Sequence, residues 1–228
     1  MKRPKDIRVP PTEWIKILGV AYPTLRERAG DLVLFGSQAL SIYMRSPLRS
    51  KDLDLLSAQV GPSQIEKLSA ELAKLKNVEF RSTSAQTRMF DSRRMTTYAI
   101  ELRIKERPFF VEVFDRILDG QALGILEAYV EPVERWELGL WAPNREATVA
   151  LRLAFRRPEG ISRFNGMRLN SFMRENQRSI RFGRLRSILK TWNIEKWVEN
   201  NLIDLYRRHK LRITGDNMII PGIEKKLK

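Results

Sequence analysis

Two aspartates interrupt an apolar segment of the chain, and this pattern restricts the possible folds more than any other feature. Asp52 and Asp54 are separated by one leucine, and leucines also occupy positions 55 and 56. On a β-strand, residues two apart project from the same face with side-chain origins about 6 to 7 Å apart, because each residue rises about 3.3 Å. An apolar strand has no packing reason to present two unpaired charges on one face. We therefore predict that Asp52 and Asp54 share a divalent cation.

A Gly-Ser pair precedes the aspartates at a point where a strand is expected to enter a helix. The apolar run of residues 32–35 stops at Gly36 and Ser37, and residues 38–44 have the composition of a short helix. Glycine lets the backbone approach a phosphate, serine offers a hydroxyl, and the start of a helix offers free N–H groups. Gly36 and Ser37 are therefore predicted to contact nucleotide phosphates.

A third carboxylate follows on a later apolar strand. Glu112 stands between Val111 and Val113, and so projects from the face opposite to these valines. Asp115 is the competing candidate, but it stands at the end of the strand, where a turn or capping residue is expected. Each of the three signals is common by itself. Their order along the chain is what indicates a metal-dependent phosphate chemistry.

In this order the motifs resemble those of the nucleotidyltransferases of the DNA polymerase β superfamily. The resemblance rests on three segments: Leu34-Phe35-Gly36-Ser37, Asp52-Leu53-Asp54-Leu55 and Val111-Glu112-Val113. Residues 40–45 and 49–54 are most similar to the AbiEii-like branch, where an Arg and a Ser or Thr precede the aspartates. The fourteen residues between Ser37 and Asp52 are interpreted as a loop insertion.

The resemblance implies a mechanism and a set of site residues. Asp52, Asp54 and Glu112 would be the catalytic residues and would hold two Mg²⁺ ions. A nucleoside triphosphate, ATP or another, would bind at Gly36 and Ser37. Its phosphate charge would be neutralised by basic residues, for which the candidates are Arg49, Lys51 and Arg152.

Two positions depart from the pattern of that branch. A Lys in a later helix is matched here by Arg152, and an Asp in a further helix is matched by Asn170. Arginine can still bind a phosphate through two hydrogen bonds, whereas asparagine cannot serve as a base. The substituted Asn170 therefore leaves a non-catalytic protein on the same fold as an alternative.

The expected fold is α+β, with a nucleotidyltransferase-like mixed sheet and flanking helices followed by a C-terminal helical bundle. Residues 1–142 would form the catalytic domain and residues 143–228 a basic helical domain. Strands are expected at 32–35, 52–56, 78–81, 95–104 and 109–114. Helices are expected at 12–28, 63–76, 147–157, 163–176, 180–192 and 194–208.

The distribution of charge along the chain indicates which kind of molecule the protein binds. Of the 42 basic residues, 20 fall after residue 140, together with only 8 of the 27 acidic residues. A basic C-terminal region favours a polyanion, so RNA, especially a tRNA end, is the expected acceptor.

The chain has no cysteine, which excludes disulfides, and it has a single histidine, His209, so a zinc site is not expected. His209 lies among basic residues and is expected to have a surface or phosphate-contacting role.

The sequence also bears on where the protein acts and on which other functions it could have. No stretch of eighteen apolar residues and no apolar signal segment occur, so a cytoplasmic protein with no membrane partner is expected. A toxin of this branch would have an antitoxin protein as partner.

Two other functions compete with nucleotide transfer. One is a metal-dependent nuclease using Asp54 and Glu101 with Arg103 or Lys105. The other is a non-catalytic nucleic-acid-binding protein on the same fold.

Overall fold

The computed structural model describes residues 7–27, 31–90, 93–117, 121–154 and 160–227. The expected helix end at Arg28 and the residues 155–157 of another expected helix lie outside these ranges. The chain forms two compact units. Unit 1 consists of residues 1–42 and 46–142, and unit 2 consists of residues 43–45 and 143–228.

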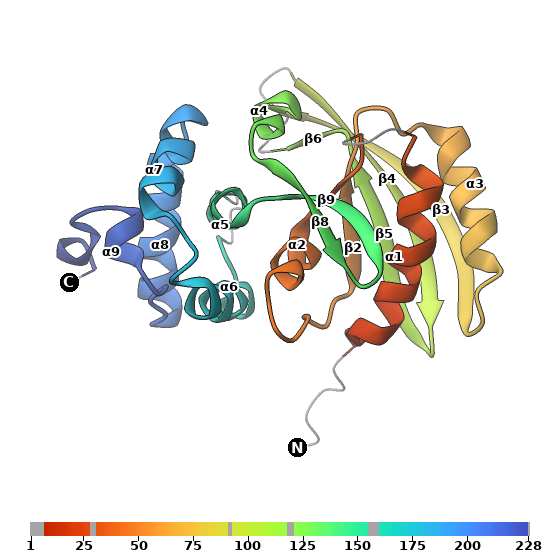
Figure 1. The fold of residues 1–228 in the computed structure, drawn as a ribbon, viewed down its shortest axis with the longest axis horizontal. Helices are drawn as coiled ribbons and strands as arrows, with labels where there is room; N and C mark the ends of the chain where they lie inside the picture. Colours follow the sequence, from red (N-terminus) through yellow and green to blue (C-terminus); the bar gives the residue numbers. More distant parts are fainter. Residues whose placement is uncertain (1–6, 28–30, 91–92, 118–120, 155–159, 228) are drawn as a thin grey trace. The chain divides into compact units, whose positions relative to one another are not determined.

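Unit 1 is built on a five-stranded mixed sheet (Figure 1). Its strands, in spatial order, are β1 (Val33–Leu34), β2 (Asp52–Leu56), β5 (Arg107–Phe114), β4 (Arg93–Ile104) and β3 (Val78–Phe90). Strands β2 and β5 are parallel, and every other neighbouring pair is antiparallel. The helices are α1 (Pro11–Leu25), α2 (Gly36–Ile42), α3 (Pro62–Ala73) and α4 (Gly124–Glu127). Short strands β6 (Arg116–Ile117) and β7 (Gln121–Ala122) pair, as do β8 (Val130–Arg135) and β9 (Leu138–Pro143). The expected α+β fold is thus confirmed.

The two faces of the central strands differ in polarity. On β2 and β5 the side chains of Leu53, Leu55, Val111 and Val113 are almost completely buried. Helices α1 and α3 contact each other, and α3 also contacts β3 and β4. Since alternate residues face opposite ways, the half-buried residues between these apolar side chains all project from the other face. That second face is the one that presents the carboxylates.

The hairpin of β3 and β4 is longer than the sequence pattern predicts. The expected strand ended at Arg81, but β3 continues to Phe90 and pairs with β4 as far as Arg93. Residues 79–89 are exposed on both faces. A strand that buries neither face has no alternation of apolar and polar residues, so periodicity could not reveal it. The turn from β4 to β5 has positive φ at Lys105 and Glu106, the conformation that favoured two-residue hairpin turns use.

Unit 2 is helical. It contains α5 (Arg145–Leu153), α6 (Arg163–Asn176), α7 (Phe182–Thr191), α8 (Glu195–His209), α9 (Asp216–Ile219) and the 3₁₀ helix η1 (Ile223–Lys225). Asn144 caps α5, and Ser162 caps α6, through side-chain oxygens that accept backbone N–H groups. Within the residues described, no helix has the length and apolar character needed to cross a membrane.

Candidate active site

Three carboxylates converge on the polar face of the central sheet. Asp54 lies directly opposite Glu112 in the parallel pairing of β2 with β5, and Asp52 is two residues before Asp54 on the same face. One oxygen of each of the three carboxylates lies within 4.8 Å of the others, and all three residues are half-buried. Like charges at this spacing repel, and carboxylate oxygens are the ligands that Mg²⁺ prefers. The donor set therefore fits a hard divalent cation.

Gly36 makes room for this cluster. Its φ of +63° belongs to the left-handed region, which favours glycine. A Cβ atom at this position would lie 1.7 Å from Oδ2 of Asp54, so the carboxylate occupies the space that any other side chain would fill. Phe35 N donates to Asp54 O at 2.9 Å, which fixes the backbone of the two segments against each other. The Gly-Ser turn and the Asp-x-Asp strand thus form one structural unit.

A chain of hydroxyl groups connects the Gly-Ser turn to the first aspartate. The Oγ atoms of Ser37 and Ser50 are 2.8 Å apart, and Ser50 Oγ donates to Asp52 Oδ1 at 2.8 Å. Because Ser50 gives its single proton to the carboxylate, Ser37 is the donor between the two hydroxyls. Both serines are buried. Ser50 is held in place by backbone hydrogen bonds in both directions with Val9.

Two supporting residues, Ser50 and Gln38, were not among the residues predicted for the site. Gln38 is completely buried, and its Nε2 atom donates to the backbone oxygen of Asp52. The signal for Ser50 was present, because it stands two residues before Asp52, the spacing that puts both side chains on one face of an extended segment. Gln38 gave no such signal, because its partner is a backbone atom.

Replacing Ser50 with alanine is expected to weaken divalent-cation binding at the cluster about tenfold. The reason is that Asp52 loses the hydroxyl that orients it, and the loss of a partner behind a metal ligand costs about 10- to 100-fold in affinity. Titration with Mn²⁺ followed by electron paramagnetic resonance measures the effect. Ser69→Ala is the matched control, because Ser69 is also buried but donates to Ile65 O within α3. Equal affinities in the two variants would contradict the role given to Ser50.

The predicted phosphate-binding cations have different surroundings. Arg49 and Lys51 are exposed, and Arg49 Nη2 donates to Arg8 O at 3.0 Å. Arg152 is half-buried on α5, which belongs to unit 2. Phosphate binding by these three residues stays a prediction.

The cations of the nuclease hypothesis and Asp115, the rival third carboxylate, bind other residues of the protein. Lys105 Nζ forms a salt bridge with Glu13 on α1 at 2.6 Å, and Arg103 Nη1 lies 3.7 Å from a carboxylate oxygen of Glu106. Asp115 Oδ1 accepts the backbone N–H of Thr96 on the neighbouring strand β4 at 2.8 Å. Within the part of the chain that the structure describes, the group of acidic residues close enough to share a cation consists of Asp52, Asp54 and Glu112.

Asn170, which the sequence comparison with the AbiEii-like branch matches to an aspartate, has a structural role. Its Oδ1 accepts hydrogen bonds from both the backbone N–H and the hydroxyl of Thr214, at 2.8 and 2.7 Å. The amide oxygen of asparagine can accept both hydrogen bonds, as a carboxylate oxygen of aspartate could. Asn170 therefore joins α6 to the segment before α9.

Comparisons with known proteins agree on the fold. No family model and no curated protein matches the sequence. Among solved structures, a candidate nucleotidyltransferase of Helicobacter pylori is similar at 16% identity, with a TM-score of 0.54 and 95% of each chain covered. The H. pylori protein JHP933 is similar at 15% identity, with a TM-score of 0.53, over 95% of this chain and 92% of its own. At such identities the likeness shows a nucleotidyltransferase-like fold.

Proposed function

We propose that the protein is a Mg²⁺-dependent nucleotidyltransferase that transfers a nucleoside monophosphate from a nucleoside triphosphate to a hydroxyl group of an RNA. The observation that supports this most is the convergence of Asp52, Asp54 and Glu112 beside Gly36. The fold that this chain shares with its structural neighbours is a further support. Three acidic ligands on adjacent strands are suited to two-metal transfer of phosphate groups.

Each residue of the site would have a distinct role in such a transfer. Asp52 and Asp54 would hold the ions, and Glu112 would join one of them. When bound, Mg²⁺ supplies positive charge that stabilises the phosphate oxygens during the reaction. The acceptor hydroxyl attacks the α-phosphorus, the bond to the β-phosphate oxygen breaks, and pyrophosphate leaves. The hydroxyl proton passes to Glu112, while Ser37 and the backbone of Gly36 contact the leaving phosphates.

RNA is proposed as the acceptor because of the charge of unit 2. Between Gly160 and Ile194 the chain has eight basic residues and one acidic residue. The exposed face of α6 combines cations with exposed apolar side chains, which suits phosphates and unstacked bases. We call this surface the α6 basic face, and it consists of Phe164, Met167, Arg168, Ser171 and Arg174. Phe164 and Met167 are 37% and 52% exposed, and the guanidinium of Arg168 stacks on Phe164 at 4.3 Å.

A hollow beside this face adds a further cation. It is lined by Arg45, Ser171, Arg174 and Glu175, and Glu175 Oε2 accepts the backbone N–H of Arg45 at 2.9 Å. The side chains of Arg45 and Arg174 are both exposed. Two arginines beside one hollow are an arrangement that can bind neighbouring phosphates of a strand.

The double variant Arg45→Ala, Arg174→Ala is expected to bind single-stranded RNA more weakly, with a salt dependence reduced by about two phosphate contacts. Fluorescence anisotropy with a labelled oligoribonucleotide, measured across a range of salt concentrations, gives both quantities. The control is Arg81→Ala, Arg103→Ala, which removes the same charge from the exposed β3–β4 hairpin of unit 1. If both double variants lose affinity equally, the effect belongs to net charge and not to the α6 basic face.

A transfer assay tests the proposed function. The protein is incubated with Mg²⁺, each of the four α-labelled nucleoside triphosphates and bulk RNA, and label is sought in RNA and in protein. Label in RNA supports the proposal, and label in protein only would replace the proposed acceptor. Degradation of the RNA would favour the nuclease. Binding of RNA without any transfer would favour the non-catalytic alternative. A toxin role and an antitoxin partner stay predictions.

A further inference from the structure

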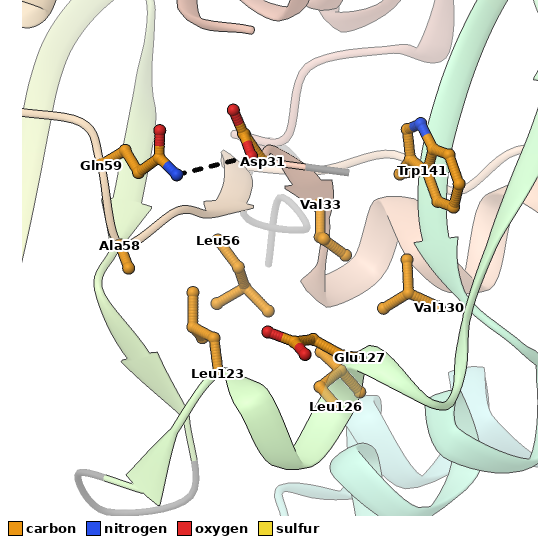
Figure 2. Close-up of a pocket in the computed structure, with 10 residues that line it drawn as sticks. All are labelled: Asp31, Val33, Leu56, Ala58, Gln59, Leu123, Leu126, Glu127, Val130 and Trp141. Carbon is orange, nitrogen blue, oxygen red and sulfur yellow. Dashed lines mark hydrogen bonds between the residues drawn. The ribbon is translucent and has the colours of Figure 1, made fainter. Parts of the chain in front are cut away.

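A cavity of about 420 Å³ lies in unit 1 on the polar face of the sheet (Figure 2). Its walls come from β1, β2, α4, β8, β9 and the segments beside β1 and β2. The lining residues are Asp31, Val33, Leu56, Ala58, Gln59, Leu123, Leu126, Glu127, Val130 and Trp141. Such a volume is within the range of pockets that hold small organic ligands, about 300 to 1,000 Å³.

The cavity is in line with the candidate active site. Leu56 is two residues after Asp54 on β2, so its side chain projects from the same face about 6 to 7 Å further along the strand. At the other end of the cluster, Ser50 contacts Asp52, and Ser37 contacts Ser50. Along this face the order is therefore hydroxyl groups, carboxylate cluster and cavity.

Two aromatic side chains, Phe35 and Phe114, lie close to the cluster and to Leu56. Phe35 follows β1 and is bonded to Asp54 through its backbone N–H, and Phe114 is paired with Leu56 across β2 and β5. Their rings are in edge-to-face contact, with centroids 6.4 Å apart, and both residues are half-buried. The aromatic pair thus lies next to Asp54 through Phe35 and next to Leu56, which lines the cavity, through Phe114.

The lining of the cavity excludes phosphate and suits a flat, hydrogen-bond-donating ring. Seven of the ten residues are apolar, and the polar ones are Asp31, Gln59 and Glu127, with no Lys or Arg among the described residues that line it. Two carboxylates would repel a polyphosphate. Figure 2 shows Asp31 and Gln59 side by side, with Gln59 Nε2 donating to Asp31 Oδ1 at 3.5 Å. A bond this long is weak and leaves the carboxylate oxygen available to a better donor.

We propose that this cavity binds the base of the nucleoside triphosphate, with Asp31 accepting a hydrogen bond from an amino group of the base. The inference rests on the proposed function, since it assumes that a triphosphate spans the carboxylate cluster. The phosphates then lie toward Ser37, and the base enters the apolar cavity beside Trp141. Adenine, guanine and cytosine have an exocyclic amino group, whereas uracil has none, so UTP is the triphosphate that binds most weakly.

The first test fills the cavity. In the variant Val130→Trp, the dissociation constant of the preferred triphosphate, measured by calorimetry with Mg²⁺, is expected to rise at least about tenfold. Binding of Mg²⁺-tripolyphosphate, which has no base, should stay as in the original protein. Val133→Trp is the matched control, because Val133 is also half-buried on β8 but does not line the cavity. Unchanged triphosphate affinity in a folded Val130→Trp variant, or an equal loss for tripolyphosphate, would overturn the inference.

A second variant keeps the cavity volume and changes only its chemistry. Asp31→Asn replaces an oxygen acceptor by an amide of the same size, and the discrimination against UTP should fall about tenfold. Unaltered discrimination would overturn the inference even if Val130→Trp did not fold. A protein that transfers label normally while both variants bind triphosphates unchanged would refute the base site alone. Failure of the original protein to bind any triphosphate would refute the proposed function with it.

Discussion

Replacing Asp54 with asparagine is expected to lower the rate of nucleotide transfer about a thousandfold. Asp54 lies opposite Glu112 and beside Gly36, at the centre of the carboxylate cluster. Asparagine has the same volume and keeps the fold, but it removes one of three negative charges that hold the cations. The loss of several kcal/mol of charge stabilisation in the transition state corresponds to a rate change of this size. Single-turnover kinetics with an α-labelled triphosphate measures it.

The control for Asp54→Asn is Asp115→Asn. Asp115 is also half-buried and stands just beyond β5, but its carboxylate accepts the Thr96 N–H and lies outside the cluster. The Asp115 variant should retain most of the transfer rate. A rate in Asp54→Asn within tenfold of the original protein would show that the cluster is not the reaction centre.

Substituting alanine for Gly36 should affect both folding and activity. An alanine with φ near +63° costs about 1 to 2 kcal/mol in backbone strain. Its Cβ would also occupy the position of the Asp54 carboxylate, which adds about 1 to 3 kcal/mol of overpacking or forces Asp54 to move. We expect unfolding free energy to fall by about 3 kcal/mol and transfer to be lost, because a displaced Asp54 no longer shares a cation with Glu112. Chemical denaturation and the transfer assay check the two effects.

Gly222→Ala separates strain from crowding. Gly222 has a similar φ of +78°, but no atom lies within 4 Å of the position that its Cβ would take. This variant should lose only the strain, about 1 kcal/mol, and keep its activity. If Gly36→Ala behaved in the same way as Gly222→Ala, the close approach of Asp54 would have no functional consequence.

The carboxylates and Gly36 could be placed from sequence because their signals are local. Period-2 alternation on β2 and β5 determines which side chains share a face, and a Gly-Ser pair between an apolar run and a helix marks the turn. The pairing of β2 with β5 was not visible, since 57 residues separate Asp54 from Glu112 in the sequence and the long β3–β4 hairpin lies within that segment. That Glu112 joins the two aspartates was expected only because the order of the motifs resembles that of the nucleotidyltransferases.

Gln38 and the cavity could not be found from sequence patterns. Ser50 stands two residues before Asp52, which is a usable signal, but Gln38 contacts a backbone atom of Asp52 that the folding of the loop brings close. The cavity is formed by α4 and by β8 and β9, which follow β5 in the chain and return to β1 and β2. A pocket made from segments about a hundred residues apart has no local signature.

The measurement that tests the central claim most directly compares two labels on the same triphosphate. The protein is incubated with Mg²⁺ and RNA, and with the triphosphate labelled either at the α-phosphate or at the γ-phosphate. The account predicts that the α-label enters the acceptor and the γ-label appears in pyrophosphate, and that both results vanish in Asp54→Asn. Transfer of the γ-label to the acceptor, or α-label transfer that persists in Asp54→Asn, would contradict a nucleotidyltransferase centred on Asp52, Asp54 and Glu112.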